Sequence, residues 1–317
     1  MNIIGIHYGH DTNVTYLKDG KCVFAISEER ISRIKFDNTW PQKSLNYIID
    51  KYNLDGEQID FIAIVGSSRL EETSGGSLKK IYKKFGLKVN LLISVVSPII
   101  NMFDNLFNFL KLRKKITLKC IKTKLNKIGI NKNKIIYLDH HFCHAMGAFH
   151  ASEFDNSLII TCDGKGDDSC HKSFAGIKNK KGQREIKLLA KSKDIDSIGF
   201  LYSAITEFLG FKALRHEGKI TGLAAYGTKD YQTISPPVIL SSDGLTLKNS
   251  LIKNNEIKSR IILLINFLLL DYKFFLKNLF NNSALELRYY QLLLLRFLKK
   301  NFNNESKENI ARYAQQE

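Results

Sequence analysis

The sequence predicts an α/β protein of about two domains, on three observations. Its 317 residues exceed what one hydrophobic core usually organises, since single cores stop growing at roughly 250–300 residues. Short apolar strands alternate with segments of helical spacing, which is the α/β pattern. A content of 44% hydrophobic and 25% charged residues excludes both a disordered chain and a protein made mainly of membrane spans.

The first part of the chain opens with a β-meander. We expect strands over residues 2–7, 12–17 and 22–27. Turn residues Tyr8 to Asp11 separate the first two strands, and Asp19-Gly20 is a hairpin signal between the second and third. Residues 41–52 have the apolar spacing of a helix, and residues 61–65 form a short apolar strand.

Two apolar stretches resemble membrane spans but fail the requirements for crossing a bilayer. Residues 89–110 contain Pro98, Asp104 and several asparagines, and predict two amphipathic helices broken near the proline. Residues 261–270 supply only half the required length and predict a buried helix. We therefore expect no transmembrane segment.

The cysteines and the N-terminus predict a cytoplasmic protein with reduced thiols. The five cysteines form no CxxC pair, and the N-terminus has no signal sequence.

The pattern restarts in the second part of the chain. Residues 134–138 predict a strand, and Asp139 is placed to cap a helix over residues 140–152. Strands are expected over residues 157–162 and 171–177, joined by a polar turn that contains glycine. This strand–turn–strand unit repeats the layout of the N-terminal hairpin.

The charge excess invites a nucleic-acid interpretation. The chain has 48 Lys+Arg against 31 Asp+Glu, a formal net charge of +17. The basic residues concentrate in 79–134 and 172–193, in the company of Asn, Ile and Phe, and no known nucleic-acid-binding module is visible there. We expect no nucleic-acid partner. RNA binding stays as an alternative hypothesis, which predicts an affinity that falls steeply with salt.

Three segments carry residues suited to chemistry, and the first is a histidine cluster. His140 and His144 are four residues apart, so on a helix their imidazoles project from one face. Asp163, directly after the next strand, can add a carboxylate. Two imidazoles and a carboxylate suit Fe(II), Mn(II) or Zn(II), but a surface or core histidine group remains the alternative. Cys143 and Cys170 have no regular metal-binding spacing.

The other two segments are rich in glycine. The turn Asp163-Gly164-Lys165-Gly166 lets the backbone approach a phosphate, and its lysine adds positive charge; a plain tight turn is the alternative. Residues 197–227 contain Gly218, Gly222 and Gly227 among small residues. This spacing is typical either of a helix packed closely through small residues or of a ligand-facing loop, in which Glu217 and Lys219 are candidate polar contacts.

Together these segments resemble the carbamoyltransferase family that includes the nodulation, cephamycin and tobramycin O-carbamoyltransferases. Roughly a third of the chain carries the resemblance, in family order: IIGIHYGHDTNVTYLKDGKCVFAISEERISRIKFD at 3–37, LDHHFCHAMGAFHAS at 138–152, ITCDGKGDDS at 160–169, and SIGFLYSAITEFLGF with HEGKITGLAAYG across 197–227. The resemblance implies an actin-like ATPase (ribonuclease H-like) fold of two related lobes, shared with the tRNA threonylcarbamoyl transferases.

The resemblance also implies roles for individual residues. His140, His144 and Asp163 match metal ligands, with iron the first expectation and zinc or manganese the alternatives. His10 and Lys35 match positions near the transferred carbamoyl group. The residues expected to line a carbamoyl-adenylate site are Asp163, Gly164, Lys165, Gly166, Gly199, Glu217, Gly218 and Lys219.

The implied substrates are carbamoyl phosphate and ATP, which give carbamoyl-adenylate, and the implied acceptor is a hydroxyl of a sugar or other natural product. His10 would take the proton of the attacking hydroxyl, because imidazole titrates near neutral pH. Lys35 or Arg33 would stabilise the developing negative charge. A metal would polarise the carbamoyl carbonyl or neutralise phosphate.

The sequence also departs from the family pattern, because family members run considerably further. By the resemblance, residues 1–135 form a first lobe with a Lys-rich helical insertion. Residues 136–317 form a second lobe that stops before the adenosine-binding segment, and the domain that makes carbamoyl-adenylate is absent. A separate C-terminal polypeptide is therefore an expected partner. The alternative is an inactive truncated remnant or a partner-binding subunit of a split enzyme.

Overall fold

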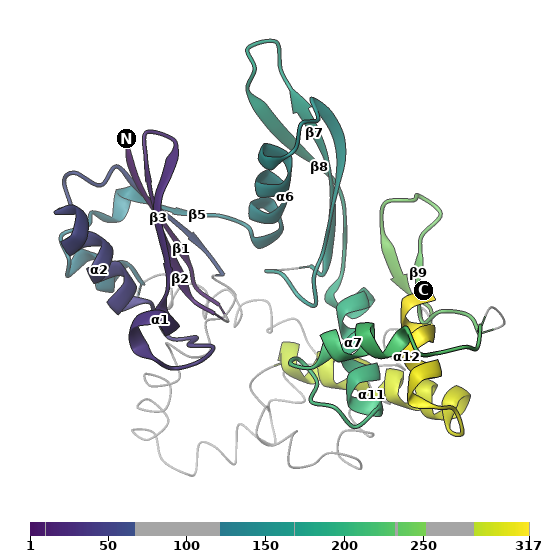
Figure 1. The fold of residues 1–317 in the computed structure, drawn as a ribbon. Helices are drawn as coiled ribbons and strands as arrows, with labels where there is room; N and C mark the ends of the chain where they lie inside the picture. Colours follow the sequence, from purple (N-terminus) through teal and green to yellow (C-terminus); the bar gives the residue numbers. More distant parts are fainter. Residues whose placement is uncertain (10, 67–120, 168, 232–233, 252–281, 317) are drawn as a thin grey trace, which may run out of the picture. The chain divides into compact units, whose positions relative to one another are not determined.

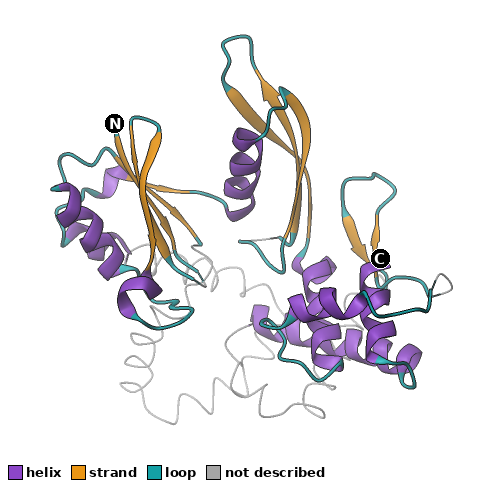
Figure 2. Ribbon diagram, in the orientation of Figure 1, coloured by secondary structure: helices purple, strands orange, loops and turns teal. Residues whose placement is uncertain are grey.

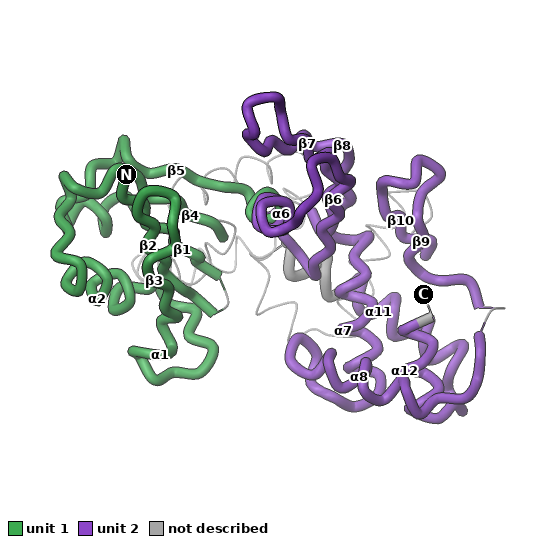
Figure 3. Tube along the Cα trace, turned by 45° about the horizontal axis from the view of Figure 1, so that its top comes forward, with its two compact units in different colours: residues 1–143 green, residues 144–317 purple. Residues whose placement is uncertain are grey.

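The computed structural model describes residues 1–9, 11–66, 121–167, 169–231, 234–251 and 282–316. They form two compact units, Met1–Cys143 and His144–Glu317, each of strands and helices (Figures 2 and 3). The predicted α/β class is thus confirmed. The apolar helices expected within 89–110 and 261–270, most of the Lys-rich insertion, and His10 lie outside the described residues.

Unit 1 is built on a five-stranded mixed sheet in the order β3-β2-β1-β4-β5 (Figure 1). Its strands are β1 (Asn2–His7), β2 (Asn13–Lys18), β3 (Lys21–Ser27), β4 (Phe61–Val65) and β5 (Ile135–Tyr137). The meander β1-β2-β3 is antiparallel, whereas β4 pairs parallel with β1, and β5 parallel with β4. All five strands lie where the sequence predicts them, within one to two residues at their ends.

The core of unit 1 forms where the sheet meets α2 (Gln42–Tyr52). Ile4 and Ile6 of β1 and Leu45 and Ile48 of α2 are at most 1% exposed. The short helix α1 (Glu28–Ser32) supplies the residue that caps the N-terminus of α2. The buried carboxylate of Glu28 accepts the backbone N–H groups of Lys43 and Ser44, which the first turn of α2 leaves without helical partners.

The carboxyl ends of β1 and β4 are held close by a glycine. The N–H of Tyr8 donates to the carbonyl of Val65 at 2.9 Å. Gly66, with φ of +89°, lies so close that a Cβ there would stand 2.0 Å from the carbonyl oxygen of Tyr8. Because any side chain would clash, glycine is required where the chain leaves β4.

Unit 2 contains a three-stranded antiparallel sheet in the order β6-β7-β8, formed by β6 (Asn156–Cys162), β7 (His171–Lys178) and β8 (Arg184–Ser192). The helix α6 (His140–Ala151) crosses the boundary between the units and lies along one face of this sheet (Figures 1 and 3). Its Ala145 and Phe149 pack on Ile159 and Phe174. The predicted helix and both predicted strands are confirmed.

The rest of unit 2 is mainly helical. Its helices are α7 (Ile198–Phe208), α8 (Glu217–Ala224), α11 (Asn282–Phe302) and α12 (Lys307–Gln316), and a hairpin joins β9 (Val238–Leu240) to β10 (Leu247–Asn249). These elements share one core around Ile205, Ile220, Leu294 and Tyr313. Within the described ranges, no helix has both the length and the apolar composition that crossing a bilayer requires.

Candidate functional site

The helix α6 positions two of the predicted metal ligands. Asp139 caps its first turn, since its carboxylate accepts the N–H of Phe142 at 2.8 Å. His141 is fully buried, whereas His140 is partly exposed and His144 exposed. The spacing of four residues therefore leaves the two outer imidazoles on the accessible side of α6, as the helical period requires.

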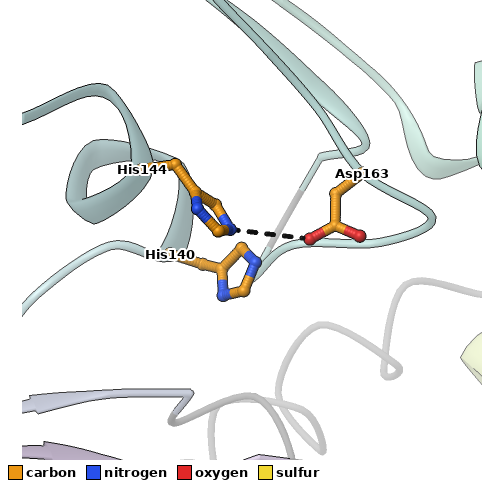
Figure 4. A group of neighbouring side chains, drawn as sticks. All are labelled: His140, His144 and Asp163. Atoms are coloured by element: carbon orange, nitrogen blue, oxygen red, sulfur yellow. Dashed lines mark ion pairs between the residues drawn. The ribbon is translucent and has the colours of Figure 1, made fainter. Parts of the chain in front are cut away.

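Asp163 faces this pair from the turn after β6 (Figure 4). Its backbone N–H continues the β6–β7 ladder, donating to Cys170 at 2.8 Å. Its Oδ1 accepts the N–H of Gly164, while its Oδ2 lies 3.8 Å from Nε2 of His144. One carboxylate oxygen is thus oriented by the turn and the other is directed at the imidazoles.

The distances fit a metal ion. One potential ligand atom from each of His140, His144 and Asp163 lies within 4.8 Å of the others. Bonds of about 2.1 Å around a tetrahedral ion separate ligand atoms by about 3.4 Å, so small side-chain rotations suffice. Two imidazole nitrogens and a carboxylate oxygen are donors that divalent iron, zinc and manganese accept. The residues present therefore fit the metal that the sequence analysis anticipates.

The neighbouring turn is tied to the chain on both sides. The ammonium of Lys165 lies 3.1 Å from the carboxylate of Asp194, in the short 3-10 helix η2 (Asp194–Asp196). The N–H of Gly166 donates to Ser169 at 2.7 Å. Lys165, predicted to contact phosphate, is thus partly neutralised by a carboxylate within the protein.

Gly199 connects the turn to α7. Ser197 caps α7 by accepting the N–H of Phe200, and its hydroxyl also donates to the carbonyl of Asp163 at 3.1 Å. A Cβ on Gly199 would stand 2.7 Å from Cα and 2.9 Å from N of Gly164. The structure therefore brings Gly199 against Asp163 and Gly164, three residues that the sequence analysis assigns to one site.

The segment 217–219 has a different environment. The carboxylate of Glu217 accepts the Ser203 hydroxyl at 3.0 Å and the N–H of Leu214, so its hydrogen bonds lie within the protein. The ammonium of Lys219 lies 5.4 Å from the ring centre of Phe211. Gly218 is exposed, and a Cβ there would meet nothing within 4 Å.

Close helix packing, one of the two interpretations left open for this region, holds for only one of its three glycines. Gly222, like Gly218, would carry a Cβ into open space. Gly227, by contrast, lies against α12, where a Cβ would stand 2.6 Å from the carbonyl oxygen of Glu308 and 2.7 Å from Cβ of Arg312. Close packing through small residues is therefore wrong for Gly218 and Gly222, because α8 turns both toward solvent.

In unit 1, Arg33 and Lys35 lie on an anchored loop. The N–H of Phe36 donates to Glu29 at 2.9 Å, and the carbonyl of Asp37 accepts the Thr12 N–H at 3.0 Å. Arg33 and Phe36 both adopt left-handed φ angles, of 62° and 57°. The loop thus presents two exposed basic side chains on a fixed backbone.

The sequence analysis does not identify two residues, Ser197 and Asp194, that hold the turn after β6 in place. Ser197 carries a local signal, a serine immediately before an apolar helix, which is typical of an N-cap. Asp194 has no local signal, since its ion pair with Lys165 depends on the tertiary fold.

The thiol of Cys170 is buried and donates to the carbonyl of Lys193, and burial with the nearby Asp194 and Asp196 carboxylates raises its pKa. Among the described residues, the group whose potential ligand atoms lie close enough for one metal ion is His140, His144 and Asp163, and it includes neither Cys143 nor Cys170.

Fold and site thus define an α/β protein with a candidate His–His–Asp metal centre. A family profile described as "Carbamoyltransferase N-terminus" matches residues 2–289, and the chain belongs to this family. An uncharacterized protein of Methanocaldococcus jannaschii is 30% identical over 228 residues, covering 72% of this chain and 34% of that protein. An uncharacterized protein of Synechocystis is 30% identical over 244 residues, covering 73% and 35%.

A third relative has a functional name. The nodulation protein NolNO of Sinorhizobium fredii is 29% identical over 218 residues, covering 69% of this chain and 28% of that protein. The chain spans about a third of the length of these curated relatives.

Proposed function

We propose that this chain is the N-terminal portion of an O-carbamoyltransferase. It would act in the transfer of a carbamoyl group from carbamoyl phosphate, by way of carbamoyl-adenylate, to a hydroxyl of a sugar or secondary metabolite. Membership of the family supports carbamoyl transfer in general. The convergence of His140, His144 and Asp163 is the observation that carries the proposal to a particular site.

The proposed fold is actin-like, with the two units as its lobes. The strand order β3-β2-β1-β4-β5 of unit 1, with an antiparallel meander followed by two parallel strands, supports a ribonuclease H-like lobe. The meander β6-β7-β8 of unit 2 supports the beginning of a second such lobe.

In the proposed site, His140, His144 and Asp163 hold a divalent ion, iron first. Such an ion supplies positive charge that polarises a carbonyl or neutralises a phosphate. Gly164 and Gly166 allow close approach of the backbone to the adenylate. Gly199 keeps the start of α7 against this turn, and Glu217 positions α7 relative to α8 through Ser203.

The remaining roles concern the acceptor. We assign to His10 the removal of the proton from the attacking hydroxyl, because a neutral imidazole is a competent base near neutral pH. Lys35 and Arg33 are exposed basic side chains on a fixed loop and would stabilise the negative charge that develops during transfer.

The test supplies the region of a curated relative that this chain does not match. The chain is combined with the remainder of the Synechocystis relative, meaning its residues outside the matched region, and incubated with radiolabelled carbamoyl phosphate, ATP and a panel of sugars. We expect ATP-dependent labelling of a sugar that is lost in His144→Ala. The control His150→Ala alters an exposed histidine on the same helix and should retain labelling. No labelling, or equal labelling in both variants, contradicts the proposal.

A further inference from the structure

Unit 1 has a pocket at the end of its sheet that lies away from the residues of the proposed reaction. The pocket has a volume of about 320 Å³ and lies between the β2–β3 hairpin and the C-terminal end of α2, near the N-terminus (Figure 1). Two of its lining residues, Asn2 and Lys18, are register partners at the amino end of β1. The basic loop 33–37 is instead attached at the carboxyl end of β1, where the N–H of Thr12 donates to the carbonyl of Asp37.

A β-bulge shapes one wall of the pocket. Tyr16 pairs with Phe24 and Leu17 pairs with Cys22, which leaves Val23 as an extra residue in β3. A bulge redirects a side chain from the regular alternation of its strand. Val23 is 41% exposed and lines the pocket. A substitution at this residue therefore changes the pocket without altering the core.

Two tyrosine rings form the aromatic part of the pocket. Tyr16 is 2% exposed and Tyr52 is partly exposed, with their ring centres 4.9 Å apart and their planes at 49°. Because the rings are in direct contact, a flat base cannot be inserted between them. They form a bent apolar surface, and the negative faces of such rings attract positively polarised C–H groups.

Side-chain amides supply oriented polar groups. The Tyr16 hydroxyl donates to Oδ1 of Asn2 at 2.9 Å, and Nδ2 of Asn2 donates to the carbonyl of Gln58 at 2.9 Å. Oε1 of Gln58 accepts the N–H of Asp55 at 3.0 Å, which fixes the amide of Gln58. Its Nε2 has no hydrogen-bond partner among the described residues. The pocket therefore offers a ligand at least one oriented N–H donor.

The charges at the pocket favour a neutral ligand. Lys18 is the one charged side chain among the described residues that line the pocket. The carboxylate of Asp19 interacts with Lys18 and pairs with the N-terminal amino group, so an anion would meet a negative charge beside the ammonium. Exposed charges of this kind are also screened by salt. No carboxylate lies among the described lining residues to attract a cation.

We propose that this pocket binds a neutral monosaccharide. The C–H face of the sugar ring packs on Tyr52, and its hydroxyl groups form hydrogen bonds with the amides of Asn2 and Gln58. The volume of about 320 Å³ is at the lower end of the range of about 300–1,000 Å³ for small-molecule pockets, which suits a single ring. The inference goes beyond the proposed transfer reaction and does not depend on it.

The test measures binding rather than catalysis. Ligand-observed NMR follows the whole chain with glucose, galactose, mannose and N-acetylglucosamine, each alone and in competition with adenosine and with inorganic phosphate. We expect at least one of these sugars to bind with a dissociation constant on the order of 1 mM or below. Adenosine and phosphate should not displace it.

Matched variants locate the bound sugar. Val23→Trp fills the pocket and should weaken sugar binding by about tenfold or more. The control Ile136→Trp places the same ring on β5, at the opposite edge of the sheet, where the parent side chain is 42% exposed, and should bind as the parent chain does. Thermal unfolding checks that both variants fold.

A second variant in the pocket does not add bulk. Gln58→Glu keeps the oxygen that accepts the N–H of Asp55 but loses the amide donor. It should weaken sugar binding by about threefold or more, as expected for the loss of one hydrogen bond. This variant decides the proposal if Val23→Trp does not fold.

Several outcomes overturn the proposal. One is the absence of binding of all four sugars at tens of millimolar. Another is equal binding by the parent chain, Val23→Trp and Gln58→Glu, which would place the sugar elsewhere on the chain. Displacement of the sugar by adenosine or by phosphate would assign the pocket to a base or to an anion. A failed sugar-labelling assay with intact binding at the pocket would remove only the proposed reaction.

Discussion

Replacing Gly199 by alanine tests whether α7 holds the Asp163 turn in place. The added Cβ would stand 2.7, 2.9 and 3.3 Å from Gly164 Cα, Gly164 N and the carbonyl carbon of Asp163. All three are backbone atoms, so the clash cannot be relieved by rotating a side chain. Overpacking of this kind costs about 1–3 kcal/mol, and the gain in helix propensity returns at most about 1 kcal/mol. We expect a net loss of stability of up to about 2 kcal/mol.

The same displacement should weaken metal binding. Because Ser197 holds the Asp163 carbonyl and Gly199 touches the next residue, a shift of α7 moves the carboxylate relative to the imidazoles. Altered support of a ligand typically costs about tenfold or more in metal affinity. Thermal unfolding and calorimetric titration with zinc or ferrous ion measure the two effects.

Gly147→Ala is the matched control. Gly147 lies in α6 between His144 and the buried Phe149, and a Cβ there would meet nothing within 4 Å. This variant should gain about 0.5–1 kcal/mol from helix propensity and keep its metal affinity. The reasoning is refuted if Gly199→Ala matches the parent chain in both stability and metal affinity.

Three further predictions concern unit 1. Glu28→Ala removes the carboxylate that accepts two N–H groups at the start of α2; it should cost about 2–4 kcal/mol in urea unfolding, and a loss below about 0.5 kcal/mol would count against that cap. For Asp37, burial opposes ionisation, but hydrogen bonds from Ser32 and Thr39 outweigh it and lower the pKa. The ionised Asp37 carboxylate therefore stabilises the fold above the unfolded pKa of about 3.9, and this stabilisation is lost as pH falls through the lower folded pKa. The thermal unfolding temperature should thus fall more steeply at acid pH in the parent than in Asp37→Asn. Parallel curves of unfolding temperature against pH would contradict this. Gly66→Ala should lower the free energy of unfolding by more than about 3 kcal/mol, because its Cβ would clash with the backbone of Tyr8. The control Gly20→Ala, with φ of +79° but open space around the added Cβ, should lower it by only about 1 kcal/mol. Similar unfolding midpoints for the two variants would refute the difference.

Local pattern predicts most strands and the metal-ligand candidates. Apolar runs bounded by turn residues locate β1 and β4, because both signals depend only on neighbouring residues. The helical period places His140 and His144 on one side of α6. Asp163 joins them because it follows a strand that packs under that helix, a step that the order helix–strand–turn already suggests.

Tertiary contacts account for what the sequence does not predict. Glu28 caps a helix that begins many residues later, and Asp194 meets Lys165 across two strands; neither pairing has a local spacing rule. Glycine spacing also misleads in α8, since helical phase turns Gly218 and Gly222 to solvent while Gly227 meets α12. The parallel pairing of β4 with β1 depends on a crossover connection, which apolar pattern alone does not orient.

Metal content is the most direct test of the candidate site. The purified chain, loaded anaerobically with ferrous ion or with zinc, is dialysed and analysed by mass spectrometry for bound metal. We predict one ion per chain, lost in His144→Ala and in Asp163→Asn and retained in His150→Ala, an exposed histidine on the same helix. A chain that holds no metal, or that holds it equally well in all three variants, would contradict the assignment of His140, His144 and Asp163 as the metal centre.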